Sequence, residues 1–294
     1  MFRLLITFAL IATIIFAACS GDDSEEPSSA TPPDDEVSIT PRPGNSELVV
    51  GPNRFAFALI DEEGSAILDG DVQLQLFFGE ELKVDQPAGF TWAIPDVSGF
   101  YVANVDFDAP GQWTAEIALT QDGEETLVTF VVPVEEASTF PNAGDTAPAS
   151  ENLTLADEPN IKRLSTDQEP NTVFYETSIA NAVTLGKPSV IIFATPAFCQ
   201  TQFCGPILDN VKDVQPDFEG QVTFIHIEPF GLDDDGQLLT GEDGGLVVAP
   251  TTLEWRLQTE PWVYFVDASG IILGRIEGAA SPEELTAAIE ATLG

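Results

Sequence analysis

The stretch that decides the fold is KPSVIIFATPAFCQTQFCGPILDNVKDV, which runs from Lys187 to Val214. Its first part, over residues 190–194, is an apolar run rich in β-branched side chains, which is typical of a buried parallel strand. A Thr-Pro break follows, and then come Cys199 and Cys204. Beyond the Gly-Pro pair after Cys204, apolar residues recur at helical spacing. The stretch therefore predicts a strand, a loop that carries two cysteines, and a helix.

The two cysteines lie where a helix can act on a thiol. The N-terminus of a helix has unpaired N–H groups and the positive end of the helix dipole, and both favour thiolate over thiol. The thiolate attacks disulfides, and a second cysteine nearby resolves the mixed disulfide. If Cys199 and Cys204 were on one helix, they would be about 7.5 Å apart along its axis, whereas a disulfide needs Cα atoms within about 7 Å. We therefore expect Cys199 in the loop, ahead of the regular helix.

The sequence around the second cysteine resembles the thioredoxin-like superfamily and is nearest to its TlpA- and peroxiredoxin-type extracytoplasmic members. Residues 203–206, Phe-Cys-Gly-Pro, are similar to the first four residues of the thioredoxin motif W-C-G-P-C. Ile207 stands where the second cysteine of that motif would be, so the pair here has the spacing Cys-x4-Cys. The buried acid that many thioredoxins carry on the preceding strand is also missing, because Ile192 and Phe193 occupy that region.

The resemblance covers residues 144–294, which open with Gly-Asp-Thr-Ala-Pro, similar to the G-D-x-A-P start of peroxiredoxin and TlpA-type domains. It implies an α/β thioredoxin-like domain that acts as a thiol-disulfide oxidoreductase and needs no cofactor. It also implies that Pro261 follows a cis peptide bond, faces the cysteines and shapes the substrate groove. We place the attack on Cys199 and the resolving role on Cys204, and the reverse assignment stays open.

The N-terminal residues resemble a bacterial lipoprotein signal. Residues 1–18 combine an early arginine with a short apolar run, as in a signal peptide. Ala17 and Ala18 come directly before Cys19, which the resemblance makes the lipid attachment site. An ordinary cleaved signal is the alternative. Residues 19–46 are rich in Ser, Pro, Asp and Glu, so we expect a disordered tether there. The resemblance implies a protein of the cell envelope that is extracytoplasmic and lipid-anchored to a bacterial membrane.

Residues 47–135 contain several short segments in which apolar and polar residues alternate between Gly, Asp and Pro. This pattern predicts an all-β sandwich that precedes the α/β domain. The sequences VVGPNRFAFALID, at 49–61, and GFYVANVDFDAPGQW, at 99–113, resemble exported immunoglobulin-type domains of the YtkA and FixH kind. Since these residues include no histidine or cysteine, we expect a spacer or docking module, joined to the α/β domain by a linker at 136–143.

The chain has one histidine, His226, in an apolar run over residues 222–227 that predicts another buried strand. We expect a packed, hydrogen-bonded core histidine there rather than a metal ligand. The acidic insertion at 231–245 contains three consecutive aspartates and a glycine, but it lacks the D-x-D-x-D-G spacing of a calcium loop. We therefore expect a solvated loop and no metal site.

Two alternative functions would use the same cysteines. A Sco-like copper-handling factor for respiratory oxidase assembly is suggested by a FixH-like domain beside a two-cysteine domain, because thiolates suit Cu(I). In Sco proteins, however, three residues separate the cysteines and the histidine lies much further downstream. A peroxiredoxin-like peroxidase is the weaker alternative, since Pro196 precedes Cys199 but Thr195 lies on the wrong side and no arginine is close in sequence.

The composition excludes some partners. A net charge of −39 with only 10 Lys plus Arg argues against nucleic-acid binding, which needs a basic surface. It also argues against direct binding to an anionic membrane surface, so membrane attachment would depend on the lipid. We expect the partners to be the thiols or disulfides of exported proteins, and the oligomeric state stays open.

Overall fold

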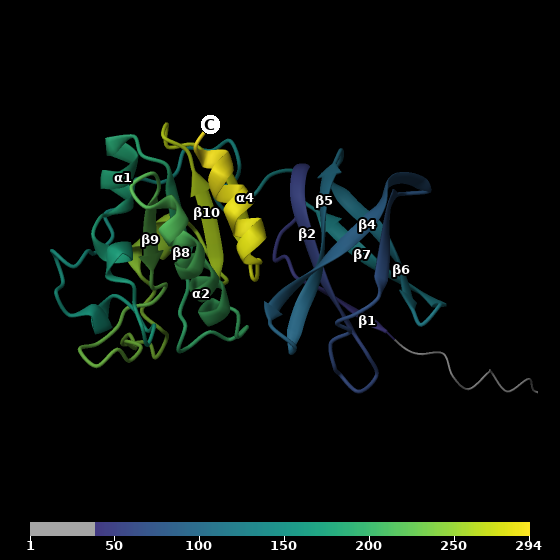
Figure 1. Ribbon diagram of the computed structural model, residues 1–294, viewed down its shortest axis with the longest axis horizontal. Coiled ribbons are helices and arrows are strands. Elements are labelled where there is room, and N and C mark those ends of the chain that lie inside the picture. The colour runs from purple at the N-terminus through teal and green to yellow at the C-terminus, as the bar shows by residue number, and fades with distance from the viewer. Residues whose placement is uncertain (1–38) are drawn as a thin grey trace, which may run out of the picture. The chain divides into compact units, whose positions relative to one another are not determined.

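The computed structural model describes residues 39–294 (Figure 1). The predicted signal peptide, Cys19 and most of the predicted tether lie outside these residues. The end of the predicted tether differs from the expectation, because β1 (Thr40–Pro43) pairs antiparallel with β2 (Gly51–Ile60). An edge strand is held through its backbone on one side only, so it needs few apolar side chains and tolerates proline. The prediction of disorder is therefore wrong for residues 40–43.

Five further strands complete the N-terminal, β-rich part: β3 (Asp71–Phe78), β4 (Glu81–Ile94), β5 (Ser98–Phe107), β6 (Gly111–Gln121) and β7 (Glu124–Val134). All neighbours are antiparallel, in the order β1-β2-β5-β4-β3-β6-β7. The long strand β4 is shared between two groups. Its residues 81–88 pair with β3, and its residues 89–94 pair with β5. β4 thus joins a layer of β1, β2 and β5 to a layer of β3, β6 and β7.

One apolar core lies between these two layers. Burial alternates along the strands: in β3, Val72, Leu74 and Leu76 are buried, whereas Gln73 is exposed and Gln75 is half-buried. The core takes large side chains from both layers, among them Phe55, Phe57, Tyr101, Phe107, Trp113 and Ile117. The expected sandwich-like, β-rich part is therefore confirmed.

A second sheet has the strand order β11-β10-β8-β9. Its strands are β8 (Ser189–Phe193), β9 (Thr223–Ile227), β10 (Trp262–Val266) and β11 (Ile272–Glu277). β8 and β9 are parallel, and β10 is antiparallel to both β8 and β11. The predicted βαβ unit is confirmed, because α2 (Cys204–Val214) connects β8 to β9. A βαβ unit followed by a β-hairpin and α4 (Pro282–Thr292) is the thioredoxin-like arrangement that the resemblance implied.

Helices cover both faces of this second sheet. α2 and α4, which lie side by side in Figure 1, pack Val211 and Leu285 into the core on one face. α1 (Ile179–Leu185) packs Ile179 and Ala182 on the other face, and α3 (Pro250–Glu254) precedes Trp255 in the same core. Short 3-10 helices occur at Ile161–Arg163, Thr172–Tyr175 and Gln215–Phe218.

The last helix begins as the sequence predicted. Ser281 is its N-cap, and its hydroxyl accepts a hydrogen bond from the Glu284 N–H at 3.2 Å, with Pro282 in the first position. None of the helices within residues 39–294 has the length and apolar character that a membrane crossing requires.

Candidate redox site

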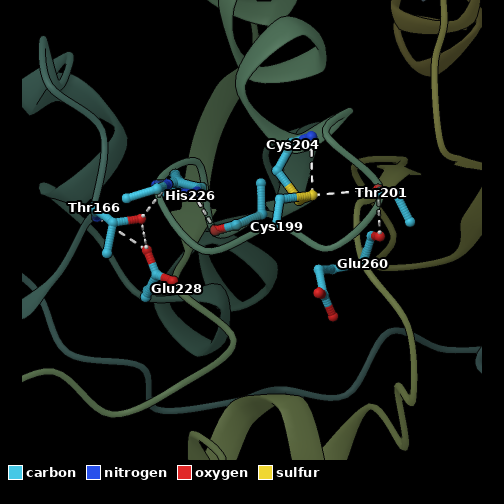
Figure 2. Close-up of a disulfide and its surroundings, with 9 residues drawn as sticks. Thr166, Cys199, Thr201, Cys204, His226, Glu228 and Glu260 are labelled. Atoms are coloured by element: carbon cyan, nitrogen blue, oxygen red, sulfur yellow. Dashed lines mark hydrogen bonds between the residues drawn. A yellow bond between two sulfur atoms is a disulfide. The ribbon is translucent and has the colours of Figure 1, made fainter. Parts of the chain in front are cut away.

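Cys199 and Cys204 form a disulfide with their Cα atoms 5.9 Å apart (Figure 2). As expected, Cys199 lies in the loop between β8 and α2, ahead of regular helix, and Cys204 is the first residue of α2. The two sulfurs differ in access: Cys199 is half-buried, whereas Cys204 is 0% exposed. A molecule from solvent can therefore reach the pair only through Cys199.

Cys199 Sγ lies at the start of α2, where it accepts a backbone hydrogen bond. The backbone N–H of Cys204, at the start of α2, donates to Cys199 Sγ at 3.3 Å. The N-cap position, Phe203, gives α2 no side-chain cap, so the other first-turn N–H groups keep their full positive character. The Thr201 hydroxyl also lies 3.2 Å from Cys199 Sγ. The Cys204 N–H and the positive start of α2 favour the thiolate of Cys199 once the disulfide opens.

A hydrogen bond connects the cysteine loop to the peptide that precedes Pro261. The Glu260–Pro261 peptide bond is cis, as the resemblance implied, and β10 begins at the next residue. The Thr201 hydroxyl donates to the Glu260 carbonyl at 3.4 Å, so Thr201 connects the cysteine loop to the peptide before Pro261 (Figure 2). Burial raises the pKa of the Glu260 carboxyl above its usual value.

His226 is a core residue, as predicted. Its Nδ1 lies 2.6 Å from the Tyr175 hydroxyl and its Nε2 lies 2.9 Å from the Ala194 carbonyl. Burial lowers the pKa of His226 to about 4. The ring is therefore neutral at neutral pH, with Nε2–H donating to Ala194 and Nδ1 accepting from Tyr175. The histidine fixes the end of β8, just before the cysteine loop.

The two nitrogens of His226 are thus engaged within the core, and the histidine does not join the cysteines in a ligand set. Within residues 39–294, no group of three or more His, Cys, Asp or Glu side chains is placed to hold a metal ion. In the acidic insertion, the Asp233 carboxylate accepts from the N–H groups of Asp235 and Gln237, each at 2.9 Å, and so closes its own turn.

Glu228 is the polar residue that sequence reasoning missed. It directly follows β9 and is buried, with Oε2 accepting from the Thr166 hydroxyl at 2.9 Å and the Thr166 N–H at 3.0 Å. The Thr166 hydroxyl in turn accepts from the Ala197 N–H at 3.2 Å. Glu228 is therefore connected through Thr166 to the loop that carries Cys199.

Burial also raises the pKa of Glu228 to about 7, against the opposing effect of Thr195 and Thr166. The Thr195 hydroxyl acts on this carboxyl, and neither Thr195 Oγ1 nor Glu228 Oε1 has another hydrogen-bond partner among the described residues. The expectation that the strand before the cysteines carries no acid is correct, because β8 reads Ser-Val-Ile-Ile-Phe. A buried acid, Glu228, instead directly follows the neighbouring parallel strand β9. A charged residue directly after a buried strand, at the edge where parallel strands end, was the signal available in the sequence.

The β-sandwich also contacts the cysteine loop. Phe203 meets Phe100 of β5 edge to face, with 5.2 Å between ring centroids. Close by, the Arg54 guanidinium of β2 forms an ion pair with Glu284 of α4 and donates to the Ala279 carbonyl at 2.8 Å. The sandwich, expected to be a spacer or docking module, is thus in contact with the residue beside the buried cysteine.

No protein-family model and no curated protein matches the chain. Among solved structures, it is similar to a thioredoxin-family thiol:disulfide interchange protein from Chlorobium tepidum TLS, at 17% identity and a TM-score of 0.35 over 54% of this chain and 100% of that one. An engineered protein matches at 12% identity and a TM-score of 0.25, over 33% of this chain and 20% of that one. The PKD domain of the human receptor SorCS2 matches at 12% identity and a TM-score of 0.21, over 44% of this chain and 99% of that one.

Proposed function

We propose that the chain is a thiol-disulfide oxidoreductase whose exchanging pair is Cys199 and Cys204. One observation carries the proposal: a half-buried sulfur that accepts from the first N–H of α2 is bonded to a fully buried sulfur at the first residue of α2. Exchange proceeds in two steps, and it needs one sulfur that a client can reach and one that resolves. The chemistry involves only these two sulfurs and the client, so the proposal includes no cofactor.

The exchange starts with a client thiolate that attacks Cys199 Sγ. The bond between the two cysteines breaks, Cys204 leaves as a thiolate, and the client is held to Cys199 as a mixed disulfide. A second client thiolate then attacks the client sulfur, which forms the client disulfide and releases Cys199. The client has lost two electrons and two protons, and the chain's disulfide has gained them. The same steps in reverse reduce a client disulfide, with Cys199 attacking and Cys204 resolving.

In this proposal Pro261 shapes the groove in which the client lies. The supporting contact is the hydrogen bond from Thr201 to the Glu260 carbonyl, which keeps the peptide before Pro261 beside the cysteine loop. The Cys204 N–H, which donates to Cys199 Sγ, supports the assignment of attack to that residue.

The test compares two variants in a Cys19→Ala background, which removes the third thiol. The parent should have a reversible two-electron couple, and both Cys199→Ser and Cys204→Ser should lose it. Incubated with a disulfide client, Cys204→Ser should accumulate a mixed disulfide at Cys199, which mass spectrometry detects. A pair that stays reduced under every oxidant, or a disulfide that no reductant opens, would contradict the proposal. Trapping by Cys199→Ser alone would reverse the two roles.

We also propose that the protein is extracytoplasmic and lipid-anchored through Cys19, with residues 144–294 as a TlpA- or peroxiredoxin-type domain. The support is the sequence Ala17-Ala18-Cys19 after an apolar run. Fractionation of cells that express the native chain and a Cys19→Ala variant, with mass spectrometry of the mature N-terminus, tests this. A soluble native protein whose unmodified N-terminus lies downstream of Cys19 would contradict it and would leave the redox proposal intact.

The clients in this proposal are the thiols or disulfides of exported proteins, and residues 47–135 form an immunoglobulin-like module beside them. The strand order supports the second part, since β1-β2-β5-β4 and β3-β6-β7 correspond to the ABED and CFG layers of that fold. A net charge of −39 disfavours acidic clients.

A further inference from the structure

The loop that carries the two cysteines contains no charged side chain. Residues 195–204 read Thr-Pro-Ala-Phe-Cys-Gln-Thr-Gln-Phe-Cys, and the first turn of α2 adds no charge. A charged group that acts on a client at Cys199 must therefore come from beyond this loop. Glu260 meets this condition, because the Thr201 hydroxyl, 3.2 Å from Cys199 Sγ, donates to the Glu260 carbonyl at 3.4 Å (Figure 2).

The carboxyl of Glu260 is free to bind a ligand. It has no hydrogen bond or ion pair among the described residues, and Figure 2 shows no bond from it to the residues drawn. The side chain is half-buried, and its oxygens are not sealed from solvent, so a client can reach them. A partly desolvated carboxylate without a partner gains more from a cation than an exposed one does, because less water screens the pair.

The other charges near the cysteine loop do not favour an anionic client. Lys212 lines a cavity beside this loop, but Asp167 and Asp209 pair with it at 2.7 Å and 2.8 Å. Glu228 is a second acid near the loop, and its charge and that of Glu260 repel each other. A client with a carboxylate beside its sulfur would therefore meet negative charge, whereas a cation would be attracted.

We propose that Glu260 selects clients with a cationic group beside the reacting sulfur, such as a lysine or arginine next to the client's cysteine. The inference rests on the proposed redox function and names the class of client that it uses. The Glu260 carboxylate pairs with the cation while the client sulfur is bonded to Cys199. The sulfur chemistry itself is unchanged: Cys199 attacks the client disulfide, one client thiolate leaves, and Cys204 displaces the other.

The test uses three small disulfides of matched length and different charge. These are cystamine, which is cationic, 2-hydroxyethyl disulfide, which is neutral, and 3,3′-dithiodipropionate, which is anionic. The reduced full-length chain in the Cys19→Ala background is mixed with an excess of each at about pH 8, and its oxidation is followed by quenched alkylation and mass spectrometry. Each disulfide takes two electrons and two protons from the cysteine pair and leaves as two thiols. An ionic strength of about 0.15 M restricts charge effects to about 8 Å.

Glu260→Gln should change the three rates differently. Relative to the parent, its oxidation by cystamine should be about fivefold slower, that by the neutral disulfide should stay within about twofold, and that by the anion should be faster. Glu260→Lys should favour the anion over cystamine. Glu125→Gln, at an exposed position on β7 of the sandwich, removes the same charge and is the matched control. It should react with all three disulfides as the parent does.

Two results would overturn the proposal and leave the redox function intact. An equal change with all three disulfides in Glu260→Gln would indicate a general effect on the Cys199 thiolate, which does not depend on the client's charge. A loss with cystamine that Glu125→Gln reproduces would assign the preference to the net charge of the chain. A parent that none of the three disulfides oxidises would instead contradict the redox proposal on which this one rests, so the two failures are distinguishable.

Discussion

The β-sandwich and the α/β part differ in what they bury. Among the described residues, every buried serine, threonine, histidine or acid lies in the α/β part, between Ser150 and Thr292. The sandwich core, by contrast, consists of apolar and aromatic side chains, and its buried Tyr101 has a pKa raised to about 12 by burial. Buried polar groups are costly unless they are paired, so proteins tend to hold them where they have a task. The difference fits the proposal that places the redox site in the α/β part and gives the sandwich an apolar core that serves stability.

The largest expected effect tests the sandwich half of this comparison. Phe57 is fully buried and packs on Phe55, Tyr101 and Phe130. Phe57→Ala should lower the free energy of unfolding by about 3–5 kcal/mol, because it removes contacts and leaves a cavity. Leu127→Ala, at an exposed position, should stay within about 0.5 kcal/mol. Urea unfolding checks both, and a loss below about 1 kcal/mol for Phe57→Ala would mean that the core is loosely packed.

The second prediction concerns the pH dependence of stability, which the α/β part should dominate. For His226 the folded pKa is about 4 against 6.5, so its contribution is present above pH 6.5 and is lost as the pH falls to 4. For Glu228 the folded pKa is about 7 against 4.5, so its contribution is present below pH 4.5 and is lost as the pH rises through 7. The two effects oppose each other between these values.

Glu228→Gln should therefore remove only the loss of stability that Glu228 causes as the pH rises, and leave the effect of His226 in place. Relative to the parent, its free energy of unfolding should increase between pH 4 and pH 8 by about 3 kcal/mol, from roughly 1.4 kcal/mol per pKa unit. Urea titrations at several pH values measure this. The exposed Glu125→Gln in the sandwich is the control and should follow the parent. A Glu228→Gln curve parallel to the parent's would show that this carboxyl is not perturbed in the folded state.

The third prediction concerns Thr166, which connects Glu228 to the cysteine loop. Thr166→Val removes the acceptor of the Ala197 N–H and a donor to Glu228, at about 1 kcal/mol for each hydrogen bond. With the loop less well held, the thiolate of Cys199 should be less stable. The rate at which the reduced pair attacks oxidised dithiothreitol at neutral pH should fall about fivefold, and the midpoint of its pH profile should rise, because Cys199 is the attacking thiolate in that direction. Thr114→Val in the sandwich is the control, and an unchanged midpoint in Thr166→Val would exclude a positioning role.

The smallest expected effect tests whether the sandwich influences the redox site. If it does, the two parts are less separate in function than their cores indicate. Phe100→Leu keeps an apolar side chain but removes the ring contact with Phe203, which is worth about 0.5–1.5 kcal/mol. Exchange with a protein client should change about two- to threefold, and exchange with dithiothreitol should stay the same. Phe90→Leu, which lies in a separate ring cluster with Trp92 and Tyr101, is the control. Equal rates of exchange with the protein client in Phe100→Leu and Phe90→Leu would show that the sandwich does not influence exchange.

Local patterns in the sequence were sufficient for much of this architecture. The apolar run of β8, the helical spacing after Cys204 and the alternation in β3 and β5 each follow from side chains close together in the chain. The placement of Cys199 outside the helix followed from the length of a disulfide. His226 was interpreted correctly because its apolar neighbours indicate a buried strand.

Features that depend on neighbours distant in sequence were not predicted. β1 is polar and proline-rich, and only its pairing with β2 makes it a strand. Glu228 reaches the cysteine loop through Thr166, a residue 62 positions away in the sequence. The contact of Phe100 with Phe203 also joins two separate parts of the chain. Such contacts arise from packing, and no periodicity within a single segment encodes them.

The strand β4, shared between two layers, has a consequence for hydrogen exchange. Because residues 81–88 pair with β3 and residues 89–94 pair with β5, neither layer can separate without releasing part of β4. Protected amides of β3 and β5 should therefore exchange through one common opening, with one free energy and one dependence on denaturant, rather than as two independent units. Amides in the two layers that report different opening free energies would show that β4 can detach from one partner while it stays on the other.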